Sequence, residues 1–146
     1  MVTNMARLDP LIKLRQKTVD DKQRVLADLY RQYETVQTQK DHLLMDLARE
    51  QALIEADITA LESRSWFGAY AERVKANIEL CDAHLARLDT RILVARDEVR
   101  HAFSEMKKVE IIDRERKKRA QKEIDDKEAR VMDEIGIDLF RRQEDQ

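Results

Sequence analysis

The sequence has few of the residues that bend a chain. It has two glycines, one proline and one cysteine among 146 residues, and aromatic side chains make up only 5%. One cysteine excludes an internal disulfide, and so little glycine and proline argues against a compact sheet protein. No run approaches the roughly 20 apolar residues of a membrane span, and the N-terminus lacks the apolar stretch of a signal peptide. We therefore expect a soluble cytoplasmic protein without direct membrane insertion.

Charged residues are abundant instead, at 40% of the chain, and the two signs nearly balance to a formal net charge of −2. This composition suits long helices with a narrow apolar stripe. The balance gives no global reason to bind nucleic acid or an anionic membrane. Glycine-rich phosphate loops and nucleophile elbows are missing from the sequence. We therefore expect that the protein is not an enzyme and that it binds no cofactor.

The most regular pattern is an apolar seam in the second half of the chain. Steps of alternately three and four residues connect ten apolar positions: Ile78, Cys81, Leu85, Leu88, Ile92, Ala95, Val99, Ala102, Met106 and Val109. The average step of about 3.5 residues is that of a left-handed coiled coil. Such a seam gains hydrophobic free energy only when another helix covers it. Cys81 is accordingly interpreted as a small apolar packing residue.

A second, rougher seam precedes the first. Its positions are Leu26, Leu29, Tyr33, Val36, Lys40, Leu43, Leu47, Ile54, Ile58 and Leu61. Asp9-Pro10 is a favourable helix start, because Asp caps a helix and Pro suits its first position. The run from Ser63 to Gly68 combines weak helix formers with a glycine and is the predicted break. Gly136 suits a left-handed C-cap.

These signals predict a single domain over residues 1–146. Helix one covers about 10–62, the tip about 63–68, helix two about 69–135 and the tail 136–146. A short connection between long helices implies antiparallel neighbours. The predicted fold is therefore all-α, a long antiparallel two-helix coiled-coil hairpin. The oligomeric state of the free chain and the order of its ends stay open.

Two sequence pairs place possible metal ligands one helical turn apart, Cys81 with His84 and Glu98 with His101. A di-iron helical bundle needs two Glu-x-x-His pairs and two further glutamates that face one core. This chain has one such pair, and both histidines lie beside the seam. We interpret the histidines as solvated and predict no metal site.

Five basic residues in a short run are candidates for partner binding: Arg114, Arg116, Lys117, Lys118 and Arg119. The run could be a solvated helix surface held by i,i+4 ion pairs, a docking site for an acidic protein surface, or a grip on phosphates. Acids follow at once, and no aromatic residues are interleaved for base stacking. Nucleic acid is therefore the least favoured of the three.

A second candidate is the aromatic cluster Trp66, Phe67 and Tyr70 near the predicted bend. These side chains could close the end of the coiled coil by packing on Leu61 and Val74. They could instead form an exposed patch for a partner, since interfaces are enriched in aromatic residues.

Several stretches resemble the flagellar FliJ family. These are Leu8–Arg15 with Val19–Lys22 at the start, Trp66 to Tyr70 near the bend, Phe103–Arg116 in the second helix, and Asp133–Gly136 near the end. Together, in this order, they cover nearly the whole chain.

The resemblance implies a non-enzymatic stalk or adaptor of the flagellar type III protein export apparatus, in the cytoplasm and peripheral to the inner membrane. The implied partners are the hexameric export ATPase, the cytoplasmic domain of the export gate, and export chaperones. In this interpretation the five basic residues contact the ATPase ring and the aromatic cluster contacts another partner. The alternative is a generic coiled-coil scaffold or a prefoldin-like chaperone.

Overall fold

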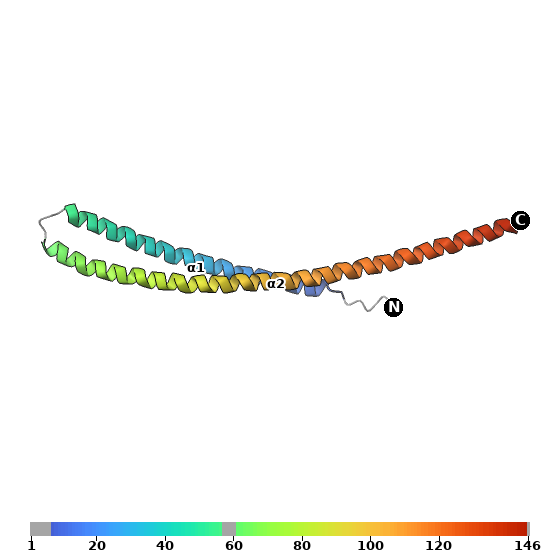
Figure 1. Ribbon diagram of the computed structural model, residues 1–146, viewed down its shortest axis with the longest axis horizontal. Helices are drawn as coiled ribbons and strands as arrows, with labels where there is room; N and C mark the ends of the chain where they lie inside the picture. Colours follow the sequence, from blue (N-terminus) through green and yellow to red (C-terminus); the bar gives the residue numbers. More distant parts are fainter. Residues whose placement is uncertain (1–6, 57–60, 146) are drawn as a thin grey trace. The chain divides into compact units, whose positions relative to one another are not determined.

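The computed structural model describes residues 7–56 and 61–145, and they form two long helices (Figure 1). Helix α1 spans Asp9–Ala56 and helix α2 spans Leu61–Glu144. The described residues contain no strand. The prediction of an all-α, two-helix hairpin is confirmed.

The chain divides into two compact units, and each is considered by itself. The hairpin unit contains Thr18–Ala102. The terminal unit contains the residues up to Lys17 and those from Phe103 onward. The single domain proposed from the sequence stays a prediction.

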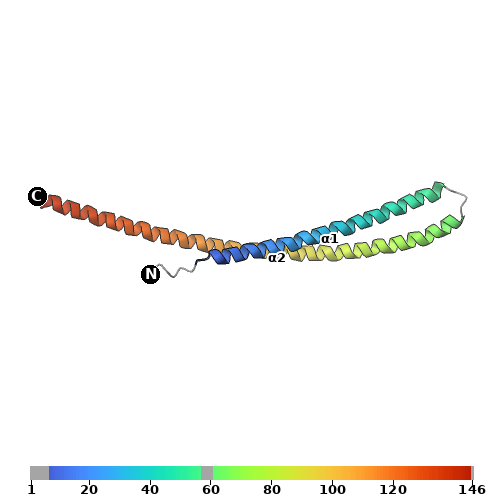
Figure 2. The same cartoon turned by 180° about the vertical axis from the view of Figure 1, so that it is seen from behind.

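In the hairpin unit α1 and α2 lie side by side and run in opposite directions (Figures 1 and 2). Two ion pairs between the helices establish this direction. Lys22 Nζ lies 3.1 Å from Glu98 Oε2, and Lys40, farther along α1, reaches back to Asp82 in α2, at 2.6 Å. At 1.5 Å per residue each arm of this unit is about 60 Å long.

The interior of the hairpin unit is the predicted pair of seams. Its central cluster consists of buried residues from both helices: Leu29, Val36, Leu85, Leu88, Ile92 and Ala95. All ten predicted positions from Ile78 to Val109 are buried or half-buried. The α1 seam is confirmed as far as Ile54, whereas Ile58 and the side chain of Leu61 lie outside the described residues.

The seam of α2 also begins earlier than predicted. Ala71 and Val74 are buried, and their spacing of three and then four residues continues to Ile78. Burial of these two side chains keeps the start of α2 helical. This explains why the predicted tip over 63–68 is wrong: these residues belong to α2, which starts at Leu61. Weak helix formers cost only tenths of a kcal/mol each, and glycine about 1 kcal/mol.

The other predicted boundaries shift with it. Helix one ends at Ala56 rather than at residue 62, and the connection, residues 57–60, lies outside the described residues. The predicted end of helix two at residue 135 is also wrong, because α2 continues to Glu144 through the predicted tail. Gly136 is not a left-handed cap, since no described glycine has a positive φ. Arg141 and Arg142 in the last turn favour this extension, because basic side chains interact well with a helix C-terminus.

In the terminal unit the start of α1 packs on α2. Leu11 and Ile12 of α1 are half-buried, and Met106 of α2 is buried. Half-buried positions continue on α2 to Ala120, whereas every residue from 121 to 145 is exposed. We call residues 121–144 of α2 the C-terminal arm.

Candidate partner-binding surfaces

The basic run lies on α2 in the terminal unit, where all five side chains are exposed. Each helical residue turns the direction of the side chain by about 100°. Arg114 and Lys118 therefore share one side of α2, whereas Arg116 and Arg119 point elsewhere. The structure does not gather the five cations into one patch.

Lys117 differs from the other members of the run because it has partners within the chain. Its Nζ lies 2.9 Å from Asp113 Oδ2 and 4.0 Å from Asp9 Oδ1 at the start of α1. The hydrogen bond to Asp113 raises the pKa of Lys117, and the charges of Asp113 and Asp9 raise it further. Lys117 thus links α2 to the first turn of α1, a role that the sequence pattern did not indicate.

Two shallow, solvent-open grooves flank Lys117. The first is lined by Ile12 of α1 and by six residues of α2: Glu110, Asp113, Arg114, Lys117, Lys118 and Gln121. The second is lined by Arg7, Leu8, Asp9, Asp113, Arg116, Lys117 and Ala120. Both grooves combine a few apolar atoms with charges of both signs. Such surfaces suit a protein segment better than an enclosed small molecule.

The aromatic cluster lies within the second and third turns of α2, in the hairpin unit. The rings of Trp66 and Tyr70 are stacked, with centroids 5.2 Å apart and planes 7° apart. Phe67 tilts against Tyr70, with centroids 6.4 Å apart. Trp66 is 52% exposed, and Phe67 and Tyr70 are half-buried. The cluster therefore presents aromatic surface to solvent, while Val74, one turn farther along α2, is buried.

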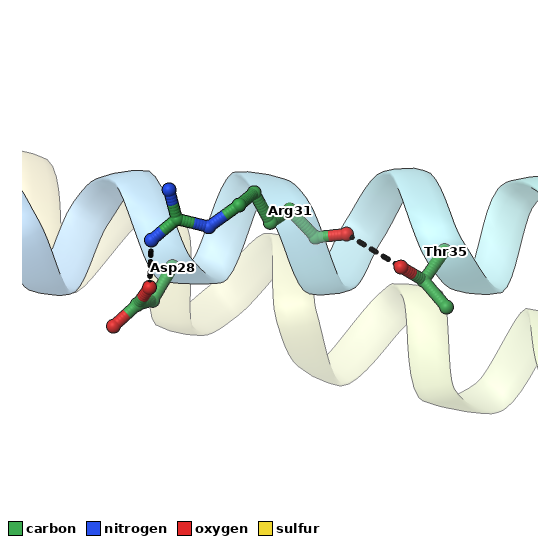
Figure 3. Close-up of polar contacts among 3 residues, drawn as sticks. All are labelled: Asp28, Arg31 and Thr35. Carbon is green, nitrogen blue, oxygen red and sulfur yellow. Dashed lines mark hydrogen bonds and ion pairs between the residues drawn. The ribbon is translucent and has the colours of Figure 1, made fainter.

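Another open groove lies along the hairpin unit. It is lined by Val36 and polar residues of α1 and by His84 of α2. Part of its wall is a short polar network (Figure 3). Arg31 pairs with Asp28, and the hydroxyl of Thr35 donates to the carbonyl of Arg31, at 3.0 Å. These contacts stay within α1 and are solvent-exposed, so each stabilises the helix by less than about 1 kcal/mol.

The candidate metal ligands occupy separate surroundings. Cys81 is half-buried against the central cluster, His84 lines the groove just described, and His101 is exposed. Within residues 7–56 and 61–145, no group of three or more His, Cys, Asp or Glu side chains could hold a metal ion. Over the same ranges, neither helix contains a stretch that is long and apolar enough to cross a membrane.

Two long helices, whose apolar seam is covered and whose outer surfaces are charged, define an all-α two-helix hairpin protein. The family model for "Flagellar FliJ protein" matches residues 4–145, nearly the whole chain, and the chain belongs to this family. Membership makes it a component of the flagellar protein export apparatus, in a family of non-catalytic proteins. No curated protein and no solved structure gave a significant match.

Proposed function

We propose that this chain is a stalk or adaptor that links the hexameric flagellar export ATPase to the export gate and to export chaperones. The observation that carries the proposal is the hairpin itself. Its apolar seam is covered by its own two helices, so the outer surfaces are left for other proteins. The place of action is the cytoplasmic side of the inner-membrane export apparatus.

A two-helix hairpin suits mechanical coupling better than catalysis. Its interior is filled by seam residues such as Leu88, which is fully buried. The grooves described above are open to water, and an enzyme site needs an enclosed place where water is excluded around the reacting groups. The proposed role is therefore to hold and position partners.

The two candidate surfaces lie on different units, which suits a protein with two partners. The basic run, residues 114–119, is assigned to the ATPase ring. The aromatic cluster of Trp66, Phe67 and Tyr70 is assigned to another component, for which exposed stacked rings supply large contact area at low conformational cost. Charged surroundings favour fast and reversible contacts.

Copurification with the cognate export ATPase, together with its rate of ATP hydrolysis, tests this proposal. Replacing the five basic residues of the run by glutamate should abolish association and any stimulation, while helicity stays unchanged. The matched control reverses five exposed basic residues of the hairpin unit: Arg73, Lys75, Arg87, Arg91 and Arg96. Equal association of the wild type and of both variants would remove the ATPase assignment. A wild-type chain that ignores the ATPase but suppresses aggregation of unrelated proteins would favour a prefoldin-like chaperone instead.

A further inference from the structure

One side of α2 in the terminal unit combines cations with apolar side chains. Steps of four, four, three, four and four residues from Phe103 reach six exposed positions: Phe103, Lys107, Ile111, Arg114, Lys118 and Lys122. At about 100° per residue these six side chains fall within a sector of roughly 100°. We call this sector the cationic face. Between Phe103 and Lys122 it contains no acidic residue.

The cationic face lies away from the packing with α1. Met106, Asp113 and Ala120 mark the packed side of α2, since they are buried or half-buried. The centre of the cationic face is roughly 130° around the helix from them. Arg114 and Lys118 also line the first groove, which is open to solvent and contains Ile12 of α1. The face is therefore available to a partner.

Its apolar part consists of two exposed side chains. Phe103 is 47% exposed and Ile111 is 52% exposed, about two turns apart on the same side. Lys107 lies between them, with its Nζ 5.3 Å from the centroid of the Phe103 ring and 2.9 Å from Glu110 Oε2. The ring and the lysine stem thus form one continuous apolar strip with a charged edge.

We propose that the cationic face binds an acidic amphipathic helix of a partner protein. Carboxylates of that helix pair with Lys107, Arg114, Lys118 and Lys122, while its apolar side chains pack on Phe103 and Ile111. The inference rests on the proposed function and deepens it, because it specifies the chemistry of the segment that the basic run recognises.

The length and width of the face favour a short protein helix over a polyanion or a membrane. Asp125 falls in the same sector directly after Lys122, so the positive strip ends after about 30 Å, at 1.5 Å per residue. A nucleic acid would bring further phosphates against Asp125 and Asp126 and finds a single aromatic ring for stacking. A membrane-binding helix needs a broad apolar side. The apolar strip of the cationic face is narrow, because Phe103 and Ile111 are its apolar residues. An interface of this size predicts weak, reversible binding.

The test uses the full chain and a labelled synthetic peptide of 20 residues, helical, with leucines on one side and glutamates on both flanks. The fluorescence anisotropy of the peptide is measured as the protein is added. The salt concentration is about 150 mM, at which interactions between exposed charges more than about 8 Å apart are screened. Arg114→Glu with Lys118→Glu should weaken binding about tenfold or more, since like charges then meet across the interface. Lys127→Glu with Arg130→Glu, which makes the same change of charge on other sides of α2, should change the affinity less than about twofold. Circular dichroism checks that both variants stay helical.

The apolar part has its own test. Phe103→Ser with Ile111→Ser, or a peptide with serines for its leucines, should weaken binding several-fold, which charge attraction alone would not predict. Equal losses for the two charge variants, or no binding at about 100 μM peptide, would overturn the proposal. So would tighter, variant-sensitive binding to phosphatidylglycerol vesicles or to a 20-nucleotide single-stranded RNA.

The same variants separate this inference from the proposed function. If Arg114→Glu with Lys118→Glu loses the peptide but still copurifies with the export ATPase, the face exists and the ATPase is not its partner. If the ATPase is lost only when Arg116 and Arg119 are also reversed and the peptide never binds, the acidic-helix inference fails while the proposed ATPase contact stands.

Discussion

Lys40 and Asp82 face each other across the two helices of the hairpin unit, with Lys40 Nζ 2.6 Å from Asp82 Oδ1. Lys40 occupies a seam position of α1 where the pattern expects an apolar residue, and it is half-buried there. Its stem lies along the seam while its ammonium reaches the exposed carboxylate at the edge. The pKa of Lys40 is raised by the hydrogen bond from Lys40 to Asp82 and by the charges of Asp82 and Asp41, against a smaller opposing effect of burial.

We expect the Lys40–Asp82 pair to lower the folding stability of the hairpin unit while favouring a single oligomeric state. Lys40→Leu should raise the urea midpoint of the hairpin, because the seam becomes continuous and Asp82, being exposed, loses little. A single polar residue at a core position fixes the register and the partner number of coiled coils. The variant should therefore also show new oligomers in size-exclusion chromatography with light scattering. A lower urea midpoint would show that the ion pair stabilises the hairpin more than a buried leucine does.

Leu88 is fully buried in the central cluster of the hairpin unit. Leu88→Ala should lower the free energy of unfolding by about 2–5 kcal/mol, the range for large cavities in cores. Urea titration followed by circular dichroism measures this change. Leu80→Ala is the matched control, because Leu80 is 68% exposed on the same helix, and should change it by less than about 0.5 kcal/mol. Similar losses for both variants would contradict the assigned seam.

The seams could be predicted from the sequence because the contact residues of a coiled coil recur every three or four positions. The positions from Leu85 to Ala95 are apolar every three or four residues, and they are the buried ones. The predicted tip is wrong because Ser63 to Gly68 carry local signals for a break, whereas burial of Ala71 and Val74 favours continued helix. The contact of Lys117 with Asp9 could not be predicted, since Asp9 comes close only after the chain folds back.

Alkaline pH should weaken the packing of α1 on α2 through two lysines, Lys40 in the hairpin unit and Lys117 in the terminal unit. The folded-state pKa values of Lys40 and Lys117 lie above the ordinary 10.5, because carboxylates hold their charged forms. A group with a raised pKa gives stability that is complete below the unfolded value and is lost as pH rises through the folded value. Thermal midpoints should thus stay level from pH 7 to about 9.5 and fall above about 10.5. In Lys40→Met with Lys117→Met the fall should be smaller, and an identical fall would refute the contribution of these two residues.

The C-terminal arm should be the least protected part of α2, because all its described residues are exposed. A helix without tertiary contacts opens easily. Hydrogen exchange should therefore be fast for the amides of 122–144 and slow for those of 85–106. A chain that stops after Gln121 should lose helical signal in proportion to its length, and its urea midpoint should stay within the error of the full chain. A clear drop in the midpoint would mean that the arm stabilises the rest of the protein.

The two interpretations of the aromatic cluster predict opposite results for Trp66. If Trp66 only covers the end of the coiled coil, Trp66→Ala should destabilise as Val74→Ala does, by roughly 1–3 kcal/mol. The exposed face of Trp66 and its stacking on Tyr70 predict instead a loss of about 1 kcal/mol or less. Urea titration separates these values, and swimming in soft agar measures function in the same variants. Loss of motility in Trp66→Ala with near-normal stability would assign the ring to a partner, whereas a stability loss equal to that of Val74→Ala would make it part of the fold.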